Sequence, residues 1–195
     1  MIGVPEPAKL SVIVQNHPDA MASQVRSIFF AAAMQTLERQ LADALKPRAF
    51  APEAALTEEV AAALQRPGRA VARVGNPQKG REDFLKDYAA LGVNAGLLID
   101  VVPREIGYWA ESPTGAFRPW VVVAYRIHDV RAGKILATGL IGMGPAPSGE
   151  TSNAVAQDNQ FSFPSFEALR GDPARAEAGL AAAIRQVARA LAQNI

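Results

Sequence analysis

The sequence contains no cysteine among its 195 residues. This absence excludes thiol catalysis, cysteine-ligated zinc and disulfide bonds, and it leaves the redox compartment undetermined. The chain also has no marked excess of positive or negative charge, because 20 lysine and arginine residues against 19 aspartate and glutamate residues give a net charge of +1. Such a chain lacks the broad positive field on which nucleic-acid binding usually rests, so we expect no nucleic-acid partner.

Long apolar runs are missing as well. No run reaches the roughly 18–20 residues that a membrane-spanning helix needs, and the first ten residues, MIGVPEPAKL, lack the apolar segment of a signal peptide. We therefore expect no transmembrane segment, and a cytoplasmic protein if the chain is complete as written. Residues 1–9 read as a lead-in or tether, followed by a single α/β domain at 10–195 that is long enough to need no metal or disulfide.

What the sequence does contain is a series of strand-like and helix-like segments. LSVIVQN (10–16) alternates as a strand does, and apolar residues recur every three or four positions from 21 to 45, which is typical of a helix with one buried stripe. A second helix is predicted at 53–65, and RAFAP (48–52) is interpreted as a very short strand. Asp172-Pro173 has the order of a helix cap followed by a first-turn proline, and it predicts the start of a closing amphipathic helix.

The middle of the chain predicts the rest of the sheet. A helical face carrying Phe84, Leu85, Tyr88 and Leu91 precedes Gly92, which suits the left-handed position after a helix end. We expect segments 10–16, 95–102, 120–129 and 135–142 to share one sheet, with the helix at 21–45 packed on it. The predicted fold class is therefore α/β, a single mixed β-sheet with a C-terminal antiparallel meander, flanked by helices.

The segment GYWAESPTGAFRPW (107–120) crowds aromatic residues around a turn in a chain that is only 7% aromatic. Ser112-Pro113-Thr114-Gly115 has the residue order of a type I turn, and the resulting hairpin sets Trp109 opposite Arg118. A regular register would split the apolar residues of the two strands between opposite faces, so we predict a one-residue bulge near Pro103.

Beyond that bulge the ribbon is expected to extend past the sheet, with aromatic side chains that one core cannot all cover. This makes the tip a candidate interaction surface, and the alternative is packing onto the protein's own helices. The residues of the candidate surface are Tyr108, Trp109, Phe117, Arg118 and Trp120.

Other candidate sites have structural interpretations that we prefer. GPAPSGET (144–151) has the glycine spacing of a phosphate loop, but Glu150 occupies the lysine position and would repel phosphate, so we expect a surface loop. Asp100 lies within an apolar strand and is expected to form a structural ion pair with Arg126 or His128, the alternative being a catalytic dyad of Asp100 and His128. His17 has no triad arrangement around it. We therefore expect no catalytic, cofactor or metal site.

Four segments within residues 10–142 form a recognisable combination: LSVIVQN, LERQLADAL, YAALGVNAGLLIDV and YRIHDVRAGKILATG. Together they resemble a class of bacterial envelope proteins. The class comprises small outer-membrane lipoproteins related to the curli-secretion lipoprotein, lipoprotein activators of penicillin-binding proteins, and the N-terminal domain of the Tol translocation protein. In this class a helix ending in Gly-Ala-Asp-like residues precedes a buried strand, whereas here Val93 and Asn94 stand where Ala and Asp are usual.

The resemblance implies a function and a location. Members are mostly non-enzymatic adaptors or assembly factors, so it implies an accessory domain that binds another envelope protein or itself, without a cofactor. It also implies a periplasmic location, with outer-membrane anchoring through a lipid on a removed N-terminus, because the chain has no lipidation cysteine. Two alternatives stay open: a small α/β enzyme using Asp100 and His128, and a small-ligand binding domain with its pocket under the loop at 144–165.

Overall fold

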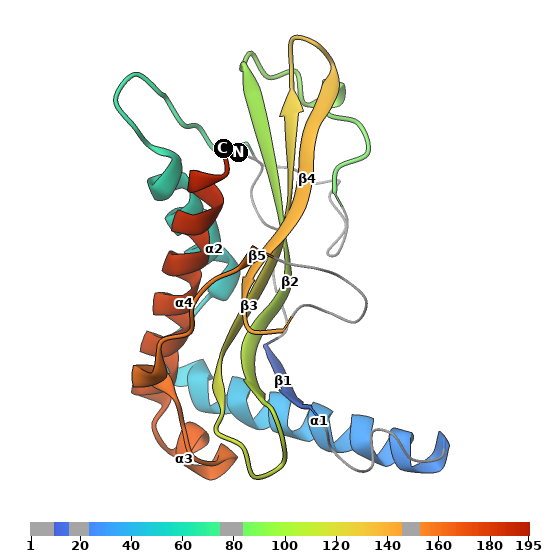
Figure 1. Cartoon of the computed structure of the whole chain (residues 1–195), viewed down its shortest axis with the longest axis vertical. Helices are drawn as coiled ribbons and strands as arrows, with labels where there is room; N and C mark the ends of the chain where they lie inside the picture. The colour runs from blue at the N-terminus through green and yellow to red at the C-terminus, as the bar shows by residue number, and fades with distance from the viewer. Residues whose placement is uncertain (1–9, 16–23, 75–83, 146–152) are drawn as a thin grey trace.

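The fold is organised around one five-stranded sheet, with strands in the order β1-β2-β3-β4-β5. The computed structural model describes residues 10–15, 24–74, 84–145 and 153–195. β2, β3 and β4 form an antiparallel meander, and β1 and β5 pair in parallel with its two outer strands. The single mixed sheet flanked by helices is the predicted α/β class (Figure 1). The strands are β1 Ser11–Val14, β2 Leu97–Ala110, β3 Arg118–Asp129, β4 Lys134–Met143 and β5 Asn153–Ala154.

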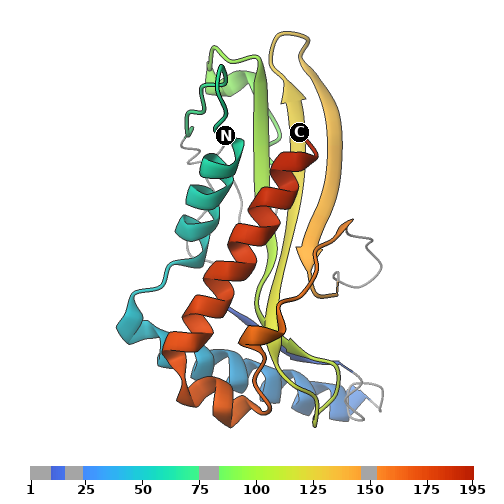
Figure 2. The ribbon, with the colours of Figure 1, turned by 60° about the vertical axis from the view of Figure 1, so that its left-hand side comes forward.

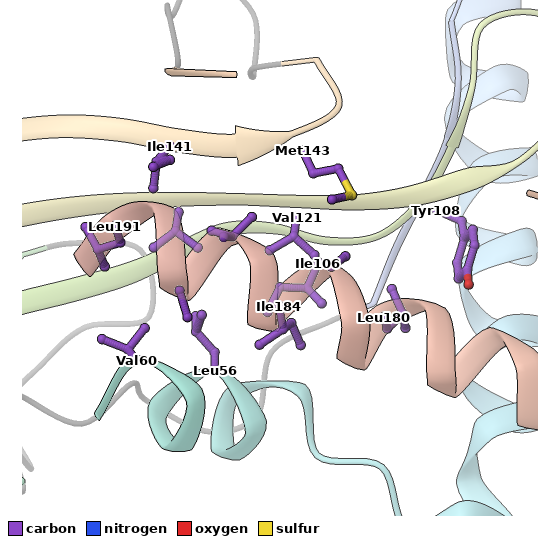
Figure 3. Packing of buried hydrophobic residues seen from close by; sticks show 14 of the residues in the cluster. Leu56, Val60, Ile106, Tyr108, Val121, Ile141, Met143, Leu180, Ile184 and Leu191 are labelled. Atoms are coloured by element: carbon purple, nitrogen blue, oxygen red, sulfur yellow. The ribbon is translucent and has the colours of Figure 1, made fainter. Parts of the chain in front are cut away.

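Three of the helices stack against one face of this sheet or across its end. α4 runs along the face and α2 lies on the outer side of α4, so that Leu56 and Val60 of α2 point toward the same core as Ile184 of α4 (Figure 3). The predicted cap of α4 is confirmed, because the Asp172 carboxylate accepts a hydrogen bond of 3.0 Å from the backbone N–H of Arg175. The helices are α1 Gln24–Leu45, α2 Pro52–Leu64, α3 Phe166–Gly171 and α4 Pro173–Gln193, with short 3₁₀ turns η1 Lys46–Arg48, η2 Ala89–Leu91 and η3 Asn159–Phe161.

The long first helix packs on the sheet as expected, but at one end of it. α1 crosses the lower end of the sheet, contacts β1 and adds Leu41 and Leu45 to the core, whereas α4 covers the sheet face (Figures 1 and 2). The predicted strand at 48–52 is wrong, because Pro47 and Pro52 sit in the first turns of η1 and α2. Ala49 between them adopts a left-handed conformation with φ 51°, and this corner turns the chain from α1 back toward α4.

The segment before β2 is mostly irregular rather than helical. Only Ala89–Leu91 form a single 3₁₀ turn, although Gly92 takes the predicted left-handed conformation with φ 60°. The helix is displaced because the backbone N–H of Leu85 donates to the side chain of Asp100 at 2.8 Å, which holds the segment flat on the sheet. It covers the face opposite α4 with a second apolar cluster of Leu85, Tyr88 and Leu98.

The predicted bulge in β2 is present. The register of β2 with β3 shifts between Pro103 and Glu105, so Arg104 is an extra residue in the strand. Because of this shift, Val101 and Tyr108 reach the same core although they are an odd number of residues apart. The side chains of Ile106 and Val121 consequently face α4 together (Figure 3).

Candidate functional site

The β2–β3 hairpin has the geometry expected from its sequence. A hydrogen bond of 2.9 Å from the backbone N–H of Gly115 to the carbonyl of Ser112 closes the predicted turn. The ladder places Trp109 opposite Arg118, as predicted. This hairpin end of β2 and β3 lies at the lower end of the sheet in Figure 1.

Three of those five residues are buried by the chain itself. Tyr108, Phe117 and Trp120 are 0%, 4% and 5% exposed, so the expectation that the tip extends past the core is wrong for them. Trp109 and Arg118 are half-buried, and an interaction role for these two stays a prediction.

The cover over the tip comes from the last third of the chain. Phe163 meets the ring of Tyr108 edge to face at 5.7 Å, and backbone hydrogen bonds of 2.7 and 2.8 Å join Phe163 to Phe117. Phe166 at the start of α3 meets Phe117 at 5.8 Å. The Tyr108 hydroxyl donates to the carbonyl of Ala176 in α4 at 3.0 Å, and burial raises the pKa of this phenol. The aromatic tip is therefore part of the main core.

Both tryptophans pack against the end of β4. The indole N–H of Trp120 donates to the carbonyl of Pro145 at 2.7 Å. Gly144 has φ 99°, and a Cβ atom there would lie 2.6 Å from Cδ1 of Trp120 and 2.9 Å from Nε1 of Trp109. The indoles thus occupy the space that a side chain at Gly144 would need. The remainder of the predicted phosphate-loop pattern, residues 146–151, lies outside the described residues.

Asp100 is fully buried and its carboxylate is used as a structural acceptor. Oδ2 accepts the backbone N–H of Leu85 at 2.8 Å and the hydroxyl of Tyr88 at 3.1 Å. Arg126, a predicted partner, lies opposite Asp100 in the ladder, and its Nη1 lies 3.5 Å from the same Tyr88 hydroxyl. These contacts fasten the irregular segment before β2 to the sheet.

His128 packs on the tyrosine that donates to Asp100. Its ring stacks on Tyr88 with centroids 4.6 Å apart, and its ladder partner is Leu98. Burial, together with the Asp100 carboxylate, raises the pKa of the Tyr88 hydroxyl from 10.0 to about 12, although Arg126 acts in the opposite direction. The phenol is therefore neutral at physiological pH and donates to Asp100. His17 lies outside the described residues.

A pocket lies at the corner between α1 and α2, whereas the loop of the ligand-binding alternative, residues 144–165, falls partly outside the described residues. Its volume is about 890 Å³, which is within the range of small-molecule sites. Its wall is partly apolar, with Leu10, Leu45 and Phe50, and partly charged, with Glu38, Arg39, Asp43, Lys46 and Glu53. Neither this pocket nor the smaller one at 65–70 includes Asp100 or His128.

β4 is an edge strand along most of its length. β5 pairs with it only at Ile141 and Gly142, and among the described residues no strand pairs with the outer side of 134–140. The carbonyl of Gly142 accepts the backbone N–H of Val155 at 2.7 Å, so Gly142 directs its backbone groups away from β3. Because backbone direction alternates along a strand, Leu140 and Thr138 also direct their N–H and C=O groups outward.

The start of this open edge carries exposed apolar side chains. Ile135 and Leu136 are 51% and 49% exposed, and Leu97 at the start of β2 is 44% exposed. Asp129 of β3 pairs with Leu97 on one side and with Lys134 on the other, so the three apolar residues belong to the same end of the sheet. This end lies at the top of Figures 1 and 2, where β4 forms the rim of the sheet. We call residues 134–140 the β4 edge.

Neither a metal centre nor a membrane span is found within the described ranges. No cluster of three or more His, Asp or Glu side chains there could hold a metal ion, and no described helix is long and apolar enough to cross a bilayer. No protein-family model and no curated protein matches the chain.

The β4 edge was not identified from the sequence, although a signal for it exists. KILATGLIGM is the last strand of the predicted meander and is followed by a long polar stretch, so no later strand was expected to cover it. A final strand in a meander is an edge by definition, and the apolar Ile135 and Leu136 on it are the unusual feature. Periodicity alone did not show that these two side chains would be exposed.

Proposed function

We propose that the chain is a non-catalytic accessory domain of the bacterial cell envelope that works by protein–protein contact at the β4 edge. The observation that carries the proposal is a row of outward backbone groups beside exposed Ile135 and Leu136. Unpaired strand edges are templates for a strand from another chain, and exposed apolar side chains beside them add contact area.

The arrangement of Asp100 supports a non-catalytic function. A general base must reach a proton of the substrate, but the Asp100 carboxylate is fully buried and accepts hydrogen bonds from Leu85 and Tyr88. His128 stacks on the ring of Tyr88, whose hydroxyl donates to Asp100. Both predicted candidates therefore hold the irregular segment in place.

The envelope location rests on the resemblance to envelope lipoproteins. One of the resembling segments, YRIHDVRAGKILATG, is the β3–β4 hairpin that carries the open edge. The proposal accordingly includes a periplasmic location, with a lipid anchor supplied by a removed N-terminal segment.

Photo-crosslinking in the bacterium that encodes the chain tests this function. A benzophenone amino acid replaces Leu136, and a matched variant carries it at Ala178, an exposed residue of α4. We expect discrete protein adducts at position 136 in the envelope fraction and none at position 178. Mass spectrometry identifies the protein in each adduct, and its complex with this chain is then reconstituted from the two purified proteins.

Two results would contradict the proposed function. One is the absence of any protein adduct at position 136. The other is reproducible turnover by the purified protein in esterase, phosphatase or peptidase screens that the Asp100→Ala variant loses.

A further inference from the structure

We infer that the partner of the β4 edge is a second copy of this chain, bound by antiparallel pairing of the two β4 strands about a two-fold axis. The inference rests on the proposed function, because it uses the same edge and names its occupant. An isologous contact needs one surface that is complementary to itself, and an antiparallel strand pair fulfils this condition.

The composition of the strand favours pairing with an identical copy. ILATGLIGM, residues 135–143, contains no charged residue and no proline. A charge near the axis of a self-paired strand would lie close to its own copy and repel it, whereas an uncharged window with branched apolar residues carries no such penalty. Natural edges that avoid self-pairing usually place a charge or a proline within such a window.

The only charged residue of β4, at its first position, favours antiparallel over parallel pairing of two copies. Lys134 begins β4, and Arg131 lies in the turn before it. Parallel pairing would bring the two copies of this basic end together, but antiparallel pairing sends them to opposite ends of the contact. With an axis at Thr138, the two Lys134 Cα atoms would be about 27 Å apart at 3.4 Å per residue.

The length of the open edge places the axis. β5 closes the edge at Ile141, and the β3–β4 turn closes it before Lys134, so the two copies present equal windows of 134–140. The middle of this window is Ala137, and the outward backbone groups next to it belong to Thr138. With the axis at Thr138, residues 136–140 of the two copies pair, so Leu136 of each copy lies opposite Leu140 of the other, and the two strands separate before Ile135 would reach Ile141, which β5 occupies.

Several features make this contact reversible. The paired residues 136–140 span about 17 Å, so the contact is smaller than the roughly 1,200–2,000 Å² of a standard interface. The register between β3 and β4 also shifts at Leu136, and such a bulge distorts the edge on its first residues. We therefore expect a dimer that dissociates on dilution.

Cysteine crosslinking tests both the partner and the strand direction, because the chain has no cysteine of its own. Single cysteines are introduced at Lys134, Ala137, Thr138 and Ala178, and each purified protein is oxidised mildly. Opposite residues in an antiparallel pair have Cα atoms about 4.5–5.5 Å apart, within disulfide reach, whereas Lys134 lies far from its copy. We expect disulfide-linked dimers from Ala137→Cys or Thr138→Cys, and none from Lys134→Cys or Ala178→Cys.

Sedimentation equilibrium provides a readout that does not depend on cysteine. The unmodified protein should show a monomer–dimer equilibrium, and Leu136→Lys should weaken association at least tenfold by placing two cations in the contact. Thr138→Pro, which removes an outward N–H while leaving the bonds to β3, should do the same. The control Ala178→Lys adds the same charge on α4 and should leave the equilibrium unchanged. Circular dichroism melts identify any variant that fails to fold.

The outcomes separate this inference from the proposed function. A protein that stays monomeric at every concentration, or crosslinks equally at all four positions, would overturn the second copy as partner. If position 136 nevertheless forms photo-adducts with a different protein, the proposed function survives and its partner is that protein. Loss of association in Ala178→Lys as well as Leu136→Lys would show a non-specific effect of charge and would also overturn the inference.

Discussion

The two hairpin ends of the meander are covered by the rest of the chain to very different degrees. At the β2–β3 end the aromatic residues are enclosed by Phe163, α3 and α4, and Phe117 is 4% exposed. At the β3–β4 end the aliphatic Ile135 and Leu136 remain about half exposed. Because both ends carry apolar side chains, their difference depends on where the later helices pack.

This difference explains why the more conspicuous sequence feature is the less accessible one. Large aromatic residues bury much area, so they are strong anchors for a core as well as for an interface. The segment from Phe163 to α4 returns to the aromatic end and supplies that core. No described helix lies over the open side of β4, so smaller side chains there remain available for contact.

The largest expected effect comes from removing an aromatic anchor at the covered end. Phe117→Ala should lower the free energy of unfolding by about 3–5 kcal/mol, because the ring is buried against Phe166 and the cavity it leaves cannot close fully. Urea unfolding followed by tryptophan fluorescence measures this change. A loss below about 1 kcal/mol would mean that this end is as loosely covered as the other.

An intermediate effect is expected at the carboxylate that holds the irregular segment. Asp100→Ala leaves the Leu85 N–H without its acceptor and should cost about 1.5–3 kcal/mol. Asp100→Asn keeps an acceptor oxygen and should cost less. Hydrogen exchange at Leu85 reports the bond directly, and equal protection in Asp100→Ala and the unmodified protein would contradict its role.

Alkaline pH tests the same cluster without a substitution at Asp100. The folded protein holds the pKa of Tyr88 at about 12, above its ordinary value of 10.0. The folded state therefore binds this proton more tightly than the unfolded state, so the stabilisation is complete below pH 10 and is lost as pH rises from 10 toward 12.

Tyr88→Phe should make the stability less dependent on pH in this window. Tyr108 also has a raised pKa, but it is present in both proteins and its contribution cancels in the comparison. Melting temperatures measured between pH 10 and pH 12 give the slope of stability against pH for the unmodified protein and for Tyr88→Phe. Identical slopes would show that Tyr88 is not desolvated in the folded protein.

The smallest effect on monomer stability is expected at the open end. Leu136→Ser should change the free energy of unfolding by less than about 0.5 kcal/mol in dilute protein, since the side chain is already about half exposed. A loss comparable to that of Phe117→Ala would mean that the open end is packed within the monomer, and the comparison between the two ends would fail.

From the sequence, local geometry could be predicted better than which distant segments of the chain pack over each strand. The Ser112–Gly115 turn, the bulge near Pro103 and the Asp172 cap depend on neighbouring residues and strand alternation, and all three are present. The helix expected around Tyr88 is wrong because a buried carboxylate 12 residues later accepts the hydroxyl of that tyrosine. This long-range hydrogen bond cannot be recognised from the spacing of apolar residues in the segment that contains Tyr88.

The candidate site could be predicted only in part for the same reason. Asp100 was expected to be buried with partners, since a buried charge in an apolar strand requires them, and the donors that the structure shows are Leu85 and Tyr88, neither of them the Arg126 or His128 of the expected ion pair. Its hydroxyl and backbone donors come from a segment outside the sheet, which strand patterns do not reveal. The burial of Tyr108 depends on Phe163 and Ala176, more than 50 residues away in the chain.

Because β2 contains an extra residue, the strand can lose one residue at the bulge without changing which side chains face the core. Arg104 is the extra residue at the register shift between Pro103 and Glu105, and the residues on either side of it already lie on the faces they would occupy in a regular ladder. A chain one residue shorter at Arg104 would therefore keep Val101 and Tyr108 in the core, with the ladder running unbroken between them. Strand interiors normally do not tolerate a change of length, because it turns half of the side chains to the wrong side. Here a deletion can be accommodated in the centre of the sheet, where insertions and deletions are usually confined to loops.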